Sequence, residues 1–238
     1  LVVLAERLGR SMLTIIAHLH VETGASIYCC MGTLEESRQA LRQLRSARAI
    51  VPDLTALSIL IITDSLALLS EIDIPILVSE GLLIELQKES LNSQHLARSE
   101  GSLGRCQGDY FFSPVNKVDQ EKWSERLTQA IMFVEEKCEV VGGSVALELP
   151  PAVQGRLAKV FPHSLIETLA LARREGSVLW TDNWRLYPAA NAEFSGQPRV
   201  WTQFISVDQL EKGRFPDPTE EKLSAAMMHL RFGHISHD

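Results

Sequence analysis

Short apolar runs that alternate with helical segments are the most restrictive feature of this sequence. The runs are typical of buried strands and lie at residues 25–31, 47–51, 74–78, 138–141, 177–181 and 199–203. A parallel return from one strand to the next needs a crossover long enough to hold a helix. The alternation therefore predicts an α/β fold in which helices flank a parallel sheet.

Helical spacing predicts the segments between these strands. The expected helices lie at residues 1–20, 33–46, 54–70, 80–89, 122–136 and 164–175. Residues 90–120 carry glycines, a proline and an aromatic cluster, which favour a β-hairpin or loop insertion.

The pattern divides the chain into three parts. We expect an N-terminal α/β accessory segment at 1–46, a main domain at 47–205 with an insertion at about 90–150, and a helical C-terminal appendage at 206–238.

Composition narrows the class of protein. The chain has 238 residues, of which 45% are hydrophobic and 22% charged, so disordered and fibrous classes are excluded. The net charge of −7 gives no chain-wide basic field, and a nucleic-acid partner would need a local basic patch. Four cysteines without a CxxC motif favour a reducing, cytoplasmic location. Residues 54–70 are too short for a membrane span and contain Asp64, so we expect no membrane partner.

Three carboxylates stand where ligands bind in such folds. Asp53 and Asp182 each follow an expected strand directly, and ligands of open parallel sheets bind at the carboxyl ends of the strands. Glu85 lies among apolar neighbours in an expected helix, where an acid usually has a partner. Together they suggest a hard divalent cation and, because Mg²⁺ is often shared with phosphates, a phosphodiester substrate.

Each acid also has a structural interpretation. Asp53 and Asp182 precede helices and suit N-caps, and Glu85 suits a solvated pair with Lys88. Ser164 to Glu167 spells a capping box, in which the glutamate bonds the amide of its own N-cap residue. Asp64 lies 11 residues beyond Asp53, roughly 16 Å along one helix, and is too far away to share an ion.

Several motifs resemble the PIN-domain nucleases. They are Val51-Pro52-Asp53-Leu54-Thr55-Ala56-Leu57, Val78-Ser79 with Leu82-Leu83-Ile84-Glu85-Leu86, and the segment from Ile166-Glu167-Thr168 to Thr181-Asp182-Asn183. The resemblance covers 47–89 and about 160–205, and extends to PIN-like modules near the C-terminus of larger bacterial multidomain proteins. Since the chain starts at Leu1, we expect a piece of a longer protein whose other domains are partners. An oligomer is compatible with this organisation.

The resemblance implies a three-layer α/β/α sandwich and a Mg²⁺- or Mn²⁺-dependent endoribonuclease acting on single-stranded RNA. It implies Asp53, Glu85 and Asp182 as metal acids, with Asn183 and Glu167 in support. Asn183 stands where many members carry another acid, and Leu165 occupies a further acid position.

Other residues are candidates for substrate contact. Arg105 and Arg185 are available for RNA, and Thr181 is placed to orient water or substrate. Aromatic residues such as Tyr110, Phe112 and Trp180 are candidates for base stacking.

Two other functions fit the same residues. Asn183, Leu165 and the negative net charge favour a PIN-like module that has lost catalysis and serves as a binding or scaffolding unit. A general α/β hydrolytic or phosphatase-like domain is the third interpretation.

Overall fold

The central sheet of the protein is parallel. The computed structural model describes residues 13, 33–106, 109–114, 116–183 and 186–214. The pairing places β1 beside β6 and β6 beside β7, places β2 beside β5, and joins both groups through a parallel bridge between Ile50 and Ile76. The resulting order is β5-β2-β1-β6-β7, which confirms the expected parallel sheet. The strands are β1 (Ala49–Pro52), β2 (Leu77–Ser79), β5 (Glu139–Val141), β6 (Ser177–Trp180) and β7 (Arg199–Val200).

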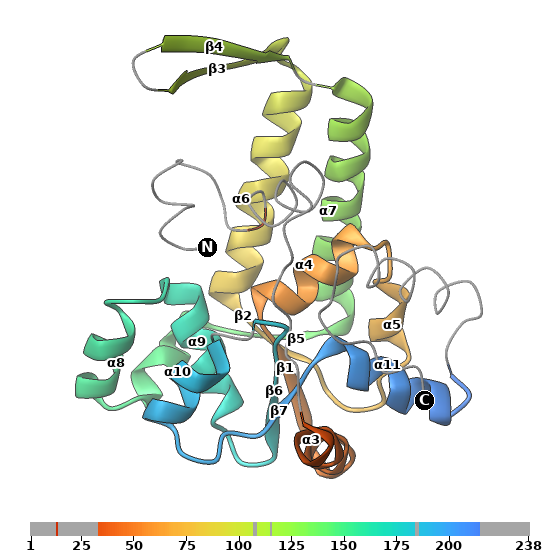
Figure 1. Cartoon of the computed structure of the whole chain (residues 1–238), viewed down its shortest axis with the longest axis vertical. Helices are drawn as coiled ribbons and strands as arrows, with labels where there is room; N and C mark the ends of the chain where they lie inside the picture. Colours follow the sequence, from red (N-terminus) through yellow and green to blue (C-terminus); the bar gives the residue numbers. More distant parts are fainter. Residues whose placement is uncertain (1–12, 14–32, 107–108, 115, 184–185, 215–238) are drawn as a thin grey trace.

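Helices cover both faces of this sheet (Figure 1). Within the described residues, none is long and apolar enough to cross a membrane. The helices of the described residues are α3 (Leu34–Ser46), α4 (Leu54–Ile62), α5 (Ala67–Ser70), α6 (Glu80–Ala97), α7 (Lys117–Lys137), the 3-10 helix η1 (Gly143–Glu148), α8 (Pro151–Leu157), α9 (His163–Ala172), α10 (Leu186–Glu193) and α11 (Thr202–Glu211).

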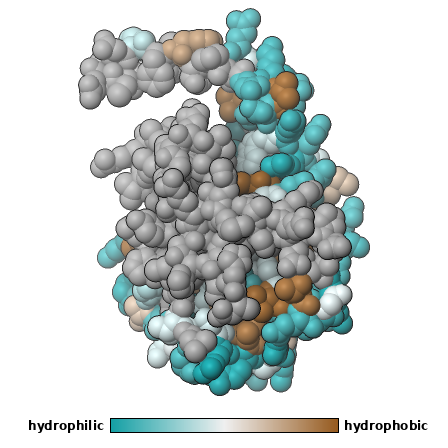
Figure 2. Space-filling model, turned by 45° about the vertical axis from the view of Figure 1, so that its right-hand side comes forward, coloured by the Kyte–Doolittle hydropathy of each residue, from teal (hydrophilic) through white to brown (hydrophobic). Residues whose placement is uncertain are grey.

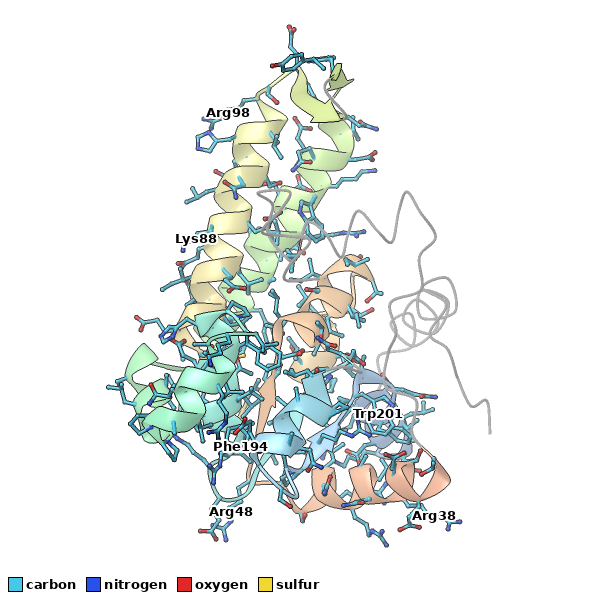
Figure 3. All side chains as sticks on the ribbon, turned by 60° about the vertical axis from the view of Figure 1, so that its left-hand side comes forward. Arg38, Arg48, Lys88, Arg98, Phe194 and Trp201 are labelled. Carbon is cyan, nitrogen blue, oxygen red and sulfur yellow. The ribbon has the colours of Figure 1, made fainter. Side chains whose placement is uncertain are left out.

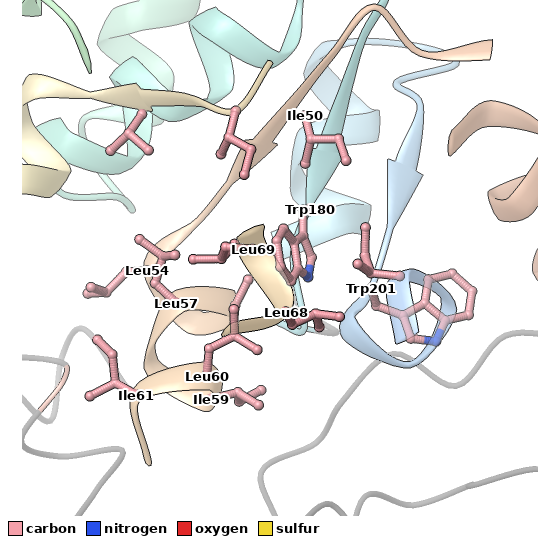
Figure 4. Close-up of a cluster of buried hydrophobic side chains, with 14 of the residues drawn as sticks. Ile50, Leu54, Leu57, Ile59, Leu60, Ile61, Leu68, Leu69, Trp180 and Trp201 are labelled. Carbon is pink, nitrogen blue, oxygen red and sulfur yellow. The ribbon is translucent and has the colours of Figure 1, made fainter. Parts of the chain in front are cut away.

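Alternation along the strands creates two cores. In β1, Ile50 belongs to the cluster with α4, α5 and α11, whereas Ala49 and Val51 belong to the cluster with η1, α8, α9 and α10. In β6, Trp180 faces the first cluster and Leu179 the second, as expected when successive side chains point to opposite faces. Figure 4 shows Trp180 among the leucines and isoleucines of the first cluster. The three-layer α/β/α sandwich is confirmed, and the burial of Trp180 excludes the base stacking suggested for it.

The expected helix at 54–70 is wrong in its length, because α4 ends at Ile62 and α5 starts separately. Asp64 adopts a left-handed φ of 56°, and the Ser65 N–H donates to the Leu60 carbonyl at 2.8 Å. This is a Schellman cap, which normally carries glycine at the left-handed position. An aspartate there gave no sequence signal for the helix end.

Other boundaries also differ from the sequence expectation, among them the start of α7 at Lys117 instead of 122 and the unexpected helices η1 and α8. Helix α6 continues to Ala97 instead of stopping at 89, and α10 was not expected. The expected strand at 199–203 is wrong beyond Val200, because Trp201 is already the N-cap of α11. The expected segments at 1–20 and 25–31 lie outside the described residues apart from Leu13, as does most of the tail at 206–238.

The insertion forms an arm that projects from the sandwich (Figure 1). Helices α6 and α7 pack side by side, and the antiparallel hairpin β3 (Gly101–Cys106) and β4 (Asp109–Pro114) lies at their far end, as expected for this segment. Tyr110 and Phe112 are exposed there. On the face seen in Figure 2, the described surface is mostly hydrophilic and its apolar side chains form separate small groups.

Glu167 connects α9 to the base of this arm. Its side chain is only 3% exposed, and its Oε2 accepts the Gly81 N–H at 2.8 Å. A Cβ added at Gly81 would lie 2.5 Å from Oε2, and one at Gly143 would lie 2.8 Å from Oε1. The capping-box interpretation of Glu167 is therefore wrong, because the bond goes to another helix and α9 begins one residue before Ser164.

We predict that Gly81→Ala destabilises the protein by about 1–3 kcal/mol, because the new methyl group overlaps Glu167 and the backbone of Ser164. Gly155→Ala in α8 is the matched control, since no atom lies within 4 Å of its added Cβ. The control is expected to stabilise by roughly 0.5–1 kcal/mol through helix propensity. Urea unfolding of both variants measures this difference, and equal effects of the two would contradict the role given to Glu167.

Candidate metal centre

Asp53 lies where β1 ends and α4 begins. Its backbone N–H donates to the Trp180 carbonyl at 2.9 Å, which fixes the residue beside the end of β6. Its Oδ1 accepts the Ala56 N–H at 2.9 Å as the N-cap bond of α4, and also the Thr55 hydroxyl at 2.6 Å. Its Oδ2 accepts the Thr181 hydroxyl at 2.6 Å. The N-cap interpretation is correct, and the bond from Thr181 shows that Asp53 also contacts the neighbouring strand end.

Asp182 follows β6 and is fully buried. Its Oδ1 accepts the Thr202 N–H at 3.0 Å and its Oδ2 accepts the Thr202 hydroxyl, so the carboxylate satisfies the first turn of α11. The pKa of Asp182 is raised to about 7. Burial is the largest cause and the charge of Asp53 also raises the pKa, whereas the hydrogen bonds from Thr202 lower it. Burial likewise raises the pKa of Asp53. The two carboxylates therefore lie close enough to interact.

Glu85 reaches the same region from α6. The Ser164 hydroxyl at the start of α9 donates to its Oε1. Partial burial raises its pKa, while the Ser164 bond and the charge of Lys88 lower it. Lys88 acts at a distance and forms no ion pair with Glu85 in the described part of the chain. The solvated-pair interpretation is thus replaced by a partner on another helix.

A small cavity joins these side chains. Its volume is about 10 Å³, and its wall includes Asp53, Glu85, Thr55, Asn183 and Ser164. Such a space holds roughly one water molecule or one small ion. Asp182 does not line the cavity, because its side chain is directed to Thr202.

The remaining sequence candidates occupy different surroundings. Asn183 lines the cavity, and its Oδ1 also accepts the Leu186 N–H at the start of α10. Glu167 lies against Gly81 and forms a 3.1 Å pair with His163, outside the cavity wall. Leu165 is buried in the core and also touches the cavity. Arg185 lies outside the described residues, and for Arg105 only the backbone within β3 is described.

Two partners of the acids were missed by the sequence analysis. Ser164 bonds Glu85 across 79 residues, and Thr202 bonds Asp182 across 20 residues. Neither pair has a local spacing signal, because Ser164 and Glu85 meet only when α9 packs against α6, and Asp182 meets Thr202 only when the end of β6 lies beside the start of α11.

The donor set suits a hard cation. Asp53 and Asp182 are 1% and 0% exposed, and neither forms an ion pair with a described lysine or arginine. Buried carboxylates without a cation are costly, and they are normally protonated or bound to a metal. The described residues contain no preformed group of three or more acids, histidines or cysteines at metal-binding separation. On the cavity wall, the oxygen donors are the carboxylates of Asp53 and Glu85 and the side-chain amide of Asn183, which are ligand types that a hard cation takes together with waters.

The fold and this site define the class of protein: a three-layer α/β/α domain with acids at the carboxyl ends of its parallel strands. The family model for the PIN domain associated with the TPR-GreAB-C-PIN system matches residues 51–192. The chain belongs to this PIN-domain family and has the nuclease-type fold of PIN domains. No curated protein and no solved structure matches it.

The raised pKa of Asp182 predicts how stability changes with pH. The folded protein holds a proton up to about pH 7 that the unfolded chain releases near 3.8, so stability decreases as the pH rises through this range. One such group changes the free energy of unfolding by at most about 1.4 kcal/mol per pH unit. Asp182→Asn removes this titration while its amide retains an oxygen for the Thr202 N–H.

We therefore expect the free energy of unfolding of the unmutated protein, relative to Asp182→Asn, to fall between pH 4 and pH 7 without divalent ions. Chemical denaturation at a series of pH values measures the difference. Parallel pH profiles for the two proteins would show that Asp182 keeps an ordinary pKa.

Proposed function

We propose that the protein is a metal-dependent endoribonuclease that hydrolyses phosphodiester bonds of single-stranded RNA. The observation that carries this proposal is the ion-sized cavity lined by Asp53, Glu85 and Asn183 at the carboxyl edge of the sheet. Its position agrees with the rule that open α/β sheets bind ligands at this edge. Membership of the PIN-domain family supports the same class of reaction.

Asp53 and Glu85 would hold Mg²⁺ or Mn²⁺, with the side-chain oxygen of Asn183 beside them. Asp182 interacts electrostatically with Asp53 from the neighbouring strand end, and a bound ion would favour its ionised form. A bound ion would supply a polarised phosphoryl oxygen and a more acidic water. Glu167 supports the site by holding α9 against the start of α6.

Hydroxyl groups keep the carboxylates in place. Thr181 donates to Asp53 and accepts the Asn183 N–H at 3.1 Å, so one side chain connects two candidate ligands. Ser164 holds Glu85 in the same manner. These bonds orient the oxygens before an ion arrives, which limits the reorganisation that binding requires.

The family description also suggests a setting for the activity. It associates this PIN domain with a TPR-GreAB-C-PIN system. We propose that tetratricopeptide and GreAB-C parts, in the same longer chain or in an associated one, are the partners of this domain.

A scaffold without catalysis is the second candidate. It is favoured by Asp182, whose two oxygens both accept bonds from Thr202, and by Asn183, which also caps α10. In a scaffold these residues would serve only to join strand ends to helices. A measurement of metal binding distinguishes the two functions, because the endoribonuclease requires a bound ion and the scaffold does not.

We predict that Asp53→Asn and Glu85→Gln each lower divalent-dependent cleavage of single-stranded RNA on the order of 100-fold, because each removes a charged ligand. Asp64→Asn is the matched control. It changes an acid beyond the end of α4, at a left-handed position that asparagine also tolerates. Cleavage of a labelled RNA with Mg²⁺ or Mn²⁺ gives the rates, and circular dichroism checks folding.

Calorimetric titration of the same variants with Mn²⁺ gives an independent test. The endoribonuclease proposal predicts binding to the unmutated protein and to Asp64→Asn, with a loss in Asp53→Asn and Glu85→Gln. Binding absent from the unmutated protein, together with no cleavage of RNA, would overturn the proposal in favour of the scaffold.

A further inference from the structure

One exposed face of helix α6 extends from the candidate metal centre to the hairpin of the arm. Lys88, His95 and Arg98 are exposed and follow one another at seven and three residues, so they lie on one side of the helix. Ser93 is on the buried side, where its hydroxyl accepts the Gln120 side-chain amide of α7 at 2.7 Å. Figure 3 shows Lys88 and Arg98 on the side of α6 that is turned away from α7. The packing of the arm therefore leaves this face uncovered.

The two cationic side chains of this face have no carboxylate partner. Neither Lys88 nor Arg98 forms an ion pair within the described part of the chain. Between the candidate metal centre and the end of α6, the sequence has one carboxylate, Glu89, and it is only 4% exposed. Glu100 lies beyond the helix, and Glu135 of α7 accepts a glutamine amide of α6 at 3.1 Å. A ligand with a row of negative charges can therefore approach both cations along the helix.

Lys88 connects this face to the candidate metal centre. It follows Glu85 by three residues, which places the two side chains on neighbouring turns of one helix. Its charge lowers the pKa of Glu85, after the larger effects of burial and of the Ser164 bond. The ammonium group thus lies near the Glu85 carboxylate without pairing with it. A lysine in this position is a point charge for a phosphate that approaches the metal centre.

The other end of the face leads to exposed aromatic side chains. Arg98 is the C-cap of α6 and lies ten residues beyond Lys88, roughly 15 Å along the helix axis. The hairpin starts three residues later, at Gly101. Tyr110 and Phe112 are 68% and 59% exposed and, being two residues apart in β4, lie on one face of the hairpin. Exposed aromatic rings are the usual platform on which single-stranded bases stack.

We infer that single-stranded RNA binds along this face of α6 and the hairpin beyond it. Its phosphates contact Lys88 and Arg98, and its bases stack on the aromatic side chains of β4. Two unpaired cations in line with the candidate metal centre favour RNA over a protein partner, because the RNA backbone carries complementary charge along its whole length. They supply local positive charge that a nucleic-acid partner needs on a chain whose net charge is −7. The inference rests on the proposed endoribonuclease, since it names the surface that holds the substrate.

Fluorescence anisotropy without divalent ions measures this binding separately from cleavage. The probe is a labelled single-stranded RNA of about 12 nucleotides, within the range of known single-strand sites. Binding is expected to weaken about threefold in Lys88→Gln and in Arg98→Gln and about tenfold in the double variant. The slope of log K against log salt is expected to fall by about one for each cation removed. Tyr110→Ala is expected to weaken binding about fivefold through lost stacking, with the salt slope unchanged.

Two matched controls lie outside the arm. Arg38→Gln in α3 removes an exposed charge without an ion pair, and Leu147→Ala in η1 removes an apolar side chain that is 75% exposed. Both are expected to bind the RNA as the unmutated protein does. A dinucleotide is too short to reach from Lys88 to Arg98, so Arg98→Gln is expected to bind it as the unmutated protein does. Circular dichroism checks the folding of every variant.

Several results would overturn the inference: no binding of the RNA, an equal loss in Arg38→Gln, or an unchanged salt slope in the double variant. RNA binding that is unaltered in Arg98→Gln, together with lost association with a tetratricopeptide protein, would assign the face to a protein partner instead. Failure of the catalytic proposal looks different. RNA binding that depends on Lys88 and Arg98, without cleavage in Mg²⁺ or Mn²⁺, would support this surface and reject the endoribonuclease.

Discussion

The burial of two carboxylates without a cation is the constraint on which the account depends. Asp53 and Asp182 directly follow adjacent parallel strands, and the carboxylate oxygens of each accept hydrogen bonds from threonine hydroxyls and helix amides. These bonds offset part of the cost of burial, but the pKa of both acids is still raised. A proton or a divalent ion would lower the remaining cost.

The rest of the sandwich places the third acid. Helix α6 starts directly after β2, so Glu85, in the second turn of α6, lies near the carboxyl edge of the sheet. There the Ser164 hydroxyl of α9 donates a hydrogen bond to it. Glu167 fixes the contact between these helices through Gly81, and only a residue without a side chain fits there. Glu167, which the sequence analysis gave as a supporting site residue, thus holds α9 against α6 next to the candidate site.

The order of strand, acid and helix was sufficient to predict the parallel sheet and the places of Asp53 and Asp182 at its edge. It was insufficient for the direction of each side chain. Asp182 faces Thr202 because α11 starts immediately after a two-residue strand, and that start had no local signal. The end of α4 was missed for a similar reason, since Asp64 adopts a conformation usually reserved for glycine.

Anomalous scattering from crystals soaked in Mn²⁺ tests the central claim most directly. The account predicts one ion in the cavity beside Asn183, with carboxylate oxygens of Asp53 and Glu85 at about 2.1 Å from it. A cavity that contains only water, with Asp53 still bonded to Thr55 and Thr181, would contradict the claim that this edge of the sheet is a metal centre.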